Sequence, residues 1–494
     1  MPYSTPAAVE SNFSRALARD RLGPFAIGSA IASSVAPLTV VTLVVPTAVA
    51  STGLIGVPIA IGAVAALLFV FVVGYLAMAR RIPNAGAFYA YVAHGVGRPA
   101  GVGTAWFALA TYTCFQLCCY GGLGAMGAPL ASRWIGFDVP WFVLAFAAWA
   151  LVAVLGASEV KVSEKVMVVL VVAETVLILF YSIAIMLGPG FTFNFTALSF
   201  GNLWQPTVGI LGVLGMTSFA GIEQSSVYIE ESKDPRRTIP VATYATVGAI
   251  MVVYALASWA QISAAGPNVV EKAAAEGGDL FFNQATAVLG GLALDVGHLL
   301  LATGLIAALV AFHNAITRYT FALGREGVLP RLFGRTTLKG APRNASMAQT
   351  GFAFLVLAVY AVAGWDPLVQ LFYWGSTAGG LGILLLYAMT SISVIGYFGR
   401  YARTETVWQR SIAPGIATVV LVVVATLAFA NLDILFGVAP GSGPARIVPI
   451  AFLLIFTFGT CWGLVLRRTK PEVYDGIGRG TRSTNTTSGL AAIH

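Results

Sequence analysis

The chain has 494 residues, of which 58% are apolar or aromatic and only 10% are charged, and its mean hydropathy is +0.84. Soluble proteins carry roughly 25% charged residues, so this composition excludes an ordinary cytosolic enzyme, a disordered chain and a nucleic-acid binder. The net charge of +8 does not indicate DNA binding, because the 28 Lys and Arg residues form short clusters between long apolar runs.

These apolar runs predict membrane-spanning helices throughout the chain. A helix that crosses the hydrocarbon core needs about 20 apolar residues, and the run from Leu22 to Ala79 contains no charged residue. Membrane-spanning strands would instead alternate polar and apolar residues. In chain order, we expect twelve helices near residues 24–49, 55–79, 101–128, 140–157, 166–187, 205–229, 241–263, 292–316, 347–363, 369–397, 412–431 and 446–466.

The basic residues predict how these helices are oriented. Lys and Arg gather in loops that face the cytoplasm. If the N-terminus is cytoplasmic, all of the 28 Lys and Arg residues except Arg133, Lys272 and Arg446 fall in cytoplasmic segments. We therefore expect a multi-pass protein of the cell (inner) membrane, embedded in the lipid bilayer, with both termini cytoplasmic. The first residues hold no apolar stretch, so no cleaved signal peptide is expected.

Two acidic residues stand inside predicted spans, whereas most of the others lie in loops or at span ends. Glu174 lies within helix five and Glu223 within helix six. A carboxylate at mid-span costs about 2.5–3.5 kcal/mol on insertion scales, so it usually faces a cavity and has a function. The alternative is a protonated Glu that is hydrogen-bonded to a neighbouring helix. His298 and His313 on helix eight are better explained as packing residues.

Helices one and six each contain a segment that favours a break. Pro37 removes a backbone donor and disfavours helix at Ala36, and small residues precede it. In helix six, Gly221 stands beside the buried Glu223. Non-helical backbone at membrane depth is tolerated only where it is buried in protein or lines a cavity. Gly and Pro are also common in ordinary spans, but paired breaks at matching places of two halves mark a transporter's midplane site.

Four segments carry a resemblance to a known family. They are Arg81–Tyr89 after helix two, Phe219–Glu223 in helix six, Glu230–Pro240 after it, and Gly324–Pro330 after helix eight. In this order, the chain resembles the amino acid–polyamine–organocation (APC) transporters, which have the leucine-transporter (LeuT) fold. The resemblance spans nearly the whole chain.

The resemblance implies an all-α membrane protein with a 5+5 inverted repeat, broken helices one and six, and two extra helices. The implied divisions are a cytoplasmic N-terminus (1–22), the first repeat with helices one to five (23–190), the second repeat with helices six to ten (204–398), helices eleven and twelve (399–468), and a cytoplasmic tail (469–494).

The resemblance also implies a substrate site between the two breaks, where half-helix dipoles and free N–H groups would bind a carboxylate. The implied substrate-binding residues are Ser33, Ser34, Val35, Ala36, Phe219, Ala220, Gly221 and Glu223. Phe219 would be an aromatic lid, although core packing also explains a Phe there. Tyr112, Phe115 and Tyr120 on helix three are further candidate gates, and spacing alone does not choose among them.

Three differences from members of the family concern coupling and substrate. Some proton-coupled relatives have a Lys in helix five, where this chain has Glu174. Helix one reads Ala-Ser-Ser-Val-Ala-Pro where many amino acid carriers have Gly-Ser-Gly. Helix eight offers one hydroxyl, Thr303, near the place where sodium-coupled members have a Ser/Thr pair. We therefore expect a proton, or exchange without an ion, in preference to sodium, with Glu174 and Glu223 as coupling residues.

The predicted function is secondary active transport of an amino acid by alternating access. An amine carrier that does not recognise a carboxylate is the alternative, and a channel or membrane sensor is the alternative from another class. No enzyme activity and no cofactor or metal are expected, since the sequence has no Gly-Lys-Ser/Thr P-loop and no HExxH or Ser/His/Asp spacing across the spans.

Overall fold

The computed structural model describes residues 23–82, 84, 86–157, 164–226, 232, 234–337, 341–401 and 405–480. The expected cytoplasmic N-terminus, the end of the tail, and residues 230, 231 and 233 of the loop motif at 230–240 lie outside the described residues. Short 3₁₀ and π segments are labelled η below, and all other regular elements are α-helices.

The first part of the chain forms the elements up to the fifth expected span. They are α1 (Pro24–Val35), α2 (Pro37–Thr39), η1 (Val40–Val44), α3 (Val45–Thr52), α4 (Val57–Arg81), α5 (Ala87–Gly95), α6 (Arg98–Ile135), α7 (Trp141–Ala157) and α8 (Glu164–Leu187).

The middle of the chain forms the next five expected spans and the segments between them. They are η2 (Phe195–Leu198), η3 (Phe200–Trp204), α9 (Val208–Ser218), η4 (Ile222–Ser226), α10 (Pro235–Ala265), η6 (Gly266–Asn268), α11 (Val269–Glu276), η7 (Gly277–Asp279), α12 (Leu280–Leu289), α13 (Leu292–Glu326), η8 (Arg331–Gly334), α14 (Arg343–Ala363), η9 (Pro367–Tyr373) and α15 (Trp374–Arg400). The last part forms η10 (Trp408–Ile412), α16 (Ala413–Ala430), α17 (Leu432–Phe436), α18 (Gly443–Thr469) and α19 (Pro471–Gly476).

The protein is an all-α integral membrane protein. Within the described residues, 10 helical segments are long and apolar enough to cross a bilayer. The other two expected spans correspond to α7, which is apolar but shorter, and to the broken helix formed by α9 and η4. The expected spans therefore match helices, while the twelve-span count and the inverted repeat stay predictions.

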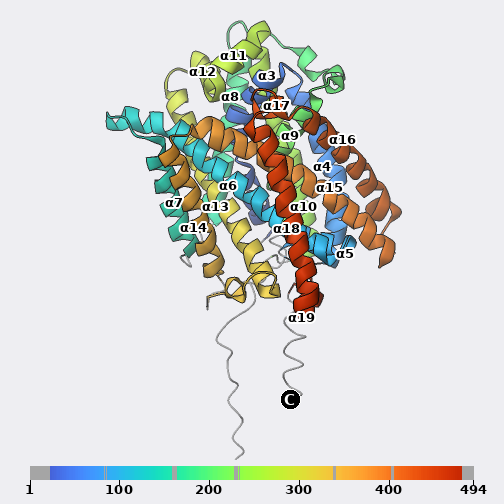
Figure 1. The fold of residues 1–494 in the computed structure, drawn as a ribbon. Helices are drawn as coiled ribbons and strands as arrows, with labels where there is room; N and C mark the ends of the chain where they lie inside the picture. Colours follow the sequence, from blue (N-terminus) through green and yellow to red (C-terminus); the bar gives the residue numbers. More distant parts are fainter. Residues whose placement is uncertain are drawn as a thin grey trace, which may run out of the picture.

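The helices form one bundle with a cap at one end (Figure 1). The segment between α10 and α13, which folds into α11 and α12, lies at the end opposite to α19, as does α3. Several helices are longer than the apolar runs predict; α13, for example, continues past the expected end at 316 to Glu326. Hydropathy marks only the part of a helix that lies in lipid, whereas backbone hydrogen bonding continues beyond it.

The longest helix, α6, crosses the bundle obliquely and packs along α18 (Figure 1). Glycines allow this contact, because a Cβ atom at Gly459 would lie 2.9 Å from the Cα of Gly103. A Cβ atom at Gly103 would likewise lie 2.8 Å from the carbonyl oxygen of Phe456. Small residues that let backbones approach are typical of helix packing in membranes, where dispersion contacts replace the hydrophobic effect.

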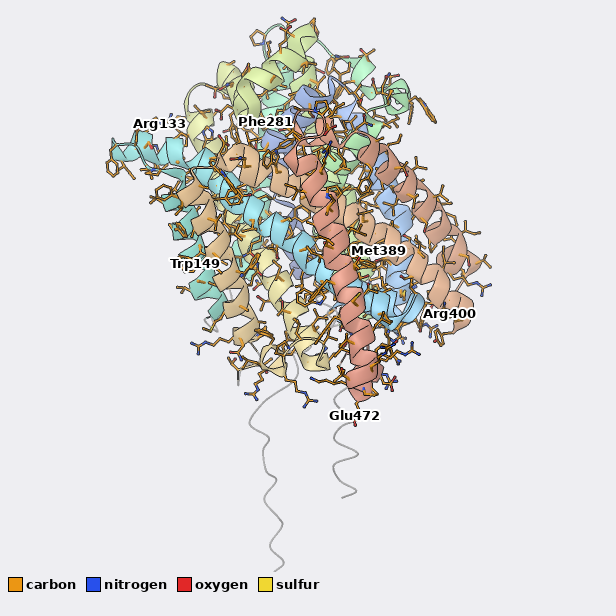
Figure 2. The ribbon with its side chains drawn as sticks, viewed as in Figure 1. Arg133, Trp149, Phe281, Met389, Arg400 and Glu472 are labelled. Atoms are coloured by element: carbon orange, nitrogen blue, oxygen red, sulfur yellow. The ribbon has the colours of Figure 1, made fainter. Side chains whose placement is uncertain are left out.

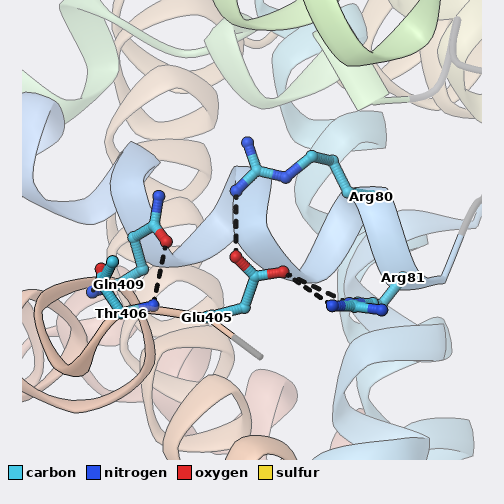
Figure 3. Close-up of polar contacts among 5 residues, drawn as sticks. All are labelled: Arg80, Arg81, Glu405, Thr406 and Gln409. Carbon is cyan, nitrogen blue, oxygen red and sulfur yellow. Dashed lines mark hydrogen bonds and ion pairs between the residues drawn. The ribbon is translucent and has the colours of Figure 1, made fainter. Parts of the chain in front are cut away.

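Charged side chains mark the end of the bundle that carries α19. Figure 2 shows Arg400 and Glu472 at this end and Arg133 at the other. Arg80 and Arg81, at the end of α4, both pair with Glu405, at N–O distances of 3.6 and 3.1 Å (Figure 3). This pairing joins the end of α4 to the loop that precedes α16. Since these groups are partly exposed, each pair contributes at most about 1 kcal/mol.

Candidate functional site

The break expected in helix one is present at Ala36. The first half, α1, ends at Val35, and Ala36 has φ 48° and ψ 74°, which is the left-handed region. Pro37 then begins the second half. The proline ring excludes right-handed helix at the preceding residue, and a left-handed Ala costs about 1–2 kcal/mol. Such strain persists only where surrounding contacts impose it, which is typical of functional sites.

The break expected in helix six is present at Gly221. The helix α9 ends at Ser218, Gly221 has φ +113°, and η4 follows from Ile222. A Cβ atom at Gly221 would lie 2.6 Å from the Cβ of Ser34. The two breaks therefore lie directly against each other. Only glycine satisfies both the positive φ and this close approach.

One hydrogen bond crosses between the two breaks. The hydroxyl of Ser34 donates to Oε1 of Gln224 on η4, at 3.0 Å, and both side chains are buried. The neighbouring Ser33 is also buried, and its hydroxyl has no hydrogen-bond partner within the described part of the chain. Val35 and Ala36 are buried beside it. The contact between the two breaks thus includes the hydrogen bond from Ser34 to Gln224 and, beside it, the hydroxyl of Ser33, which could bind a ligand.

Glu223 holds the helix-six break together with two other helices. Its Oε2 accepts a hydrogen bond from the backbone N–H of Gly221 at 3.1 Å and another from the Tyr387 hydroxyl of α15 at 2.6 Å. Its backbone oxygen accepts the Tyr75 hydroxyl of α4 at 2.7 Å. Tyr112 of α6 also lies beside this carboxyl group. The predicted acidic residue is therefore the centre of a buried polar cluster.

Glu174, which lies on α8, contacts the helix-one break. Its Oε2 accepts the backbone N–H of Leu38 at 3.2 Å, in the first turn after Pro37. A carboxylate at this place is stabilised by the positive end of the helix dipole. On the other side is Gly304 of α13, where a Cβ atom would lie 2.2 Å from Oε1 of Glu174. The absence of a side chain at Gly304 is thus what admits the buried carboxylate.

The predicted aromatic residues lie in two places. Phe219 is fully buried at the helix-six break, and its ring centroid lies 6.1 Å from that of Tyr254. The buried Tyr254 hydroxyl has no hydrogen-bond partner among the described residues. Phe115 instead stacks on Phe312 of α13, with 5.3 Å between centroids, and packs on Gly379. The structure therefore places Tyr112 beside the carboxyl group of Glu223 and Phe219 against Tyr254 at the helix-six break. Phe115 lies between α6, α13 and α15.

A second buried polar chain, not predicted from the sequence, connects α6, α13 and α14. Gln349 donates to Oε1 of Gln116 at 2.6 Å, and the amide of Gln116 lies 3.3 Å from Nδ1 of His313. Nε2 of His313 lies 2.8 Å from the Ser346 hydroxyl. Gly156 of α7 gives this chain room, since a Cβ atom there would lie 2.5 Å from Nε2 of His313. Both ring nitrogens of His313 therefore have a partner, as expected of a packing residue.

Several residues that contact Glu174, Glu223 or Ser34 could not be identified from the sequence. Tyr75, Tyr387, Gln224 and Gly304 carry no local signal, because a lone Tyr, Gln or Gly in an apolar span is common. Each acquires its role from a partner far away in the chain. A buried acidic residue requires such partners, so only the existence of donors, and not their identity, was predictable.

Comparison with known proteins agrees with this arrangement. A family model described as amino acid permease matches residues 22–471. The lysine-specific permease LysP of Lactococcus lactis is 29% identical over 33% of this chain and 33% of its own length. The histidine permease HisP of the same species is 26% identical over 52% of this chain and 54% of its own. The putrescine importer PlaP of Escherichia coli is 25% identical over 55% and 59%. The chain thus aligns with only part of each relative's length.

Proposed function

The chain belongs to the amino acid permease family, and we propose that it is a secondary transporter that carries an amino acid by alternating access around the two helix breaks. The observation that carries this proposal is the close approach of Gly221 to Ser34, which sets the breaks of helices one and six side by side inside the bundle. Unwound helices that face each other across a repeat interface are typical substrate sites in transporters. We infer a LeuT-type 5+5 inverted repeat on the same grounds.

The proposed substrate site consists of the residues around these breaks. Ser33, Ser34, Val35 and Ala36 provide it from helix one, and Phe219, Ala220 and Gly221 from helix six, with Phe219 as the lid. Glu223, Tyr112 and Phe115 complete the proposed set of substrate-binding residues. A hydroxyl without a partner, as at Ser33 and Tyr254, costs free energy when buried, and a bound ligand would satisfy it.

We propose that the coupling ion is a proton taken up by Glu174. The carboxylate of Glu174 stands between Leu38 of the broken helix and Gly304 of α13. A sodium ion needs several oxygen ligands. The neighbouring hydroxyl, Thr303, donates to the carbonyl of Leu300 in its own helix at 2.9 Å. Protonation of Glu174 would weaken its bond to Leu38 and so connect proton binding to the helix-one break.

A second candidate substrate class is an amine without a carboxylate. Several N–H groups at the breaks already have acceptors: Leu38 donates to Glu174, Gly221 to Glu223, and Ile222 to the carbonyl of Phe219. Pro37 has no N–H group to offer. A substrate carboxylate would have to displace a carboxylate of the protein, whereas an amine would find two carboxylates nearby.

Matched pairs of ligands test both classes. Proteoliposomes are preloaded with unlabelled solute, and uptake of each labelled compound is measured separately. The compounds are compared in three pairs, lysine with cadaverine, ornithine with putrescine, and histidine with histamine, because the members of each pair differ only in the carboxylate. We expect saturable uptake that is stimulated by internal solute and restricted to one member of a pair. Uptake of both members without saturation would indicate a channel, and binding without flux would indicate a sensor.

We further propose that the protein lies in the cell (inner) membrane with both termini cytoplasmic. The distribution of Lys and Arg supports this orientation, since Arg133, Lys272 and Arg446 alone would face outward. A reporter fused to the C-terminus that is active only in the cytoplasm tests it.

A further inference from the structure

The segment that follows the last membrane helix folds back onto the bundle. The end of α19 and the residues that follow it, Tyr474–Gly480, are named here the C-terminal strap and lie at the end of the bundle that carries α19 (Figure 1). Ile477 of the strap is 1% exposed, and Gly478 lies so close to His94 of α5 that a Cβ atom would be 2.9 Å from the imidazole. The strap is therefore a packed part of the structure.

The strap binds a buried carboxylate. Gly478 and Gly480 have φ of +80° and +60°, and their N–H groups donate to Oε2 and Oε1 of Glu326 at 2.7 and 2.8 Å. Backbone N–H groups that converge in this way form an anion-binding nest. Glu326 is only 5% exposed, and it also accepts the side-chain amide of Asn84 at 3.0 Å. Hydrogen bonds to an ionised acceptor are roughly twice as strong as those between neutral groups.

Through these contacts the strap joins three helices that reach the candidate site. Glu326 is the last residue of α13, which contacts Glu174 through Gly304. Asn84 follows α4, which reaches Glu223 through Tyr75. Asp475 of the strap pairs with Arg98 at 2.8 Å, and Arg98 begins α6, which carries Tyr112.

From this geometry we propose that the C-terminal strap is a latch that holds the adjacent end of the transport path closed. A path that opens at this end requires α4, α6 and α13 to separate there. The strap contacts α6 through Arg98 and α13 through Glu326, and it is connected to α4 through the bond from Asn84 to Glu326. Release of the strap would leave Glu326 without the two N–H donors of Gly478 and Gly480, and water entering the opened end would replace them. The latch rests on the proposed alternating access, and it regulates that cycle from outside the substrate site.

Two truncations and two glycine variants test the latch. One truncation ends the chain after Gly476 and removes the nest, whereas its control ends after Gly480 and keeps it. Gly478→Ala disrupts the nest, because it places a side chain at φ +80° and against His94. Its control is Gly399→Ala, where nothing lies within 4 Å of the added atom. The full-length protein and all variants are placed in lipid nanodiscs.

Hydrogen–deuterium exchange is followed by mass spectrometry at η4 and at the last turns of α13. Truncation after Gly476 and Gly478→Ala should raise exchange there about tenfold, a free-energy change of about 1.4 kcal/mol. Both controls should exchange as wild type does, and α11 and α12 at the far end should not change in any variant. Unchanged exchange at η4, or faster exchange at both ends, would overturn the latch. Because this readout needs no substrate, failure of transport itself is detected separately, by the uptake assay.

Discussion

Gly221 and Ser34 are buried against each other, and a Cβ atom on Gly221 would lie 2.6 Å from the Cβ of Ser34. The two residues belong to different broken helices, so their contact fixes how the breaks face each other. Neither can be enlarged without moving a backbone that also carries Glu223 and Gln224. The geometry of the candidate site therefore depends on the absence of one side chain.

We predict that Gly221→Ala abolishes transport and destabilises the protein. The positive φ and the clash with Ser34 each cost about 1–3 kcal/mol, which the break cannot absorb without moving. Uptake in proteoliposomes and the thermal unfolding temperature are measured together. Gly399→Ala is the control, because its Cβ atom meets nothing within 4 Å. Wild-type uptake by Gly221→Ala would show that the contact has no role in the cycle.

Glu223→Gln should reduce transport at least about tenfold while the protein still folds. The amide keeps the shape of the side chain, but it weakens the bonds from Tyr387 and the Gly221 N–H, which are now made to a neutral acceptor. Tyr387→Phe, which removes only the hydroxyl, should have a smaller effect of the same kind. Initial uptake rates for both variants measure this, with the amount of folded protein set equal by size-exclusion chromatography. If Glu223→Gln transports at the wild-type rate, Glu223 is a packing residue.

Gly304→Ala should have the same consequences as a change at Glu174. The added methyl would occupy the place of Oε1 of Glu174, so the carboxylate would leave the N–H of Leu38. Gly304→Ala, Glu174→Ala, which removes the acceptor of the Leu38 N–H, and the double variant are compared in the uptake assay. Residues in contact are non-additive, so the double variant should be no worse than the poorer single variant. Losses that multiply in the double variant would separate Gly304 from Glu174.

A structural feature could be predicted from the sequence when it depends on interactions between residues close together in the chain. The spans were predictable, because a bilayer imposes a length and an apolar composition on each helix. The breaks were predictable, because Pro37 and Gly221 act on their own backbone. The ends of α13 and α6 were not predictable, since helices continue into water without an apolar signal. The small helices α11 and α12 lie in a loop where no span was expected.

The candidate site was predictable only in part. Glu174 and Glu223 are conspicuous because charge is rare in a span. That Glu174 would contact Gly304, and Glu223 would contact Tyr387, depends on how distant helices pack, and one sequence does not contain that information. The same holds for Glu326, whose partners Gly478 and Gly480 lie 152 and 154 residues away in the chain. Its place in a loop motif after helix eight gave no indication of a C-terminal partner.

The last prediction concerns the coupling ion. Uptake into proteoliposomes is compared under an inward proton gradient, an inward sodium gradient and no gradient. We expect the proton gradient to stimulate uptake and the sodium gradient to leave it unchanged, because Thr303 is the one hydroxyl near Glu174 on this stretch of α13 and already donates to Leu300. Glu174→Gln should abolish the response to the proton gradient while solute exchange persists, since the amide still accepts from Leu38 but cannot be protonated. Thr303→Ala is the matched variant, and it should keep the proton response. Strict dependence on sodium at constant pH, lost in Thr303→Ala, would instead identify Glu174 and Thr303 as ligands of a sodium ion.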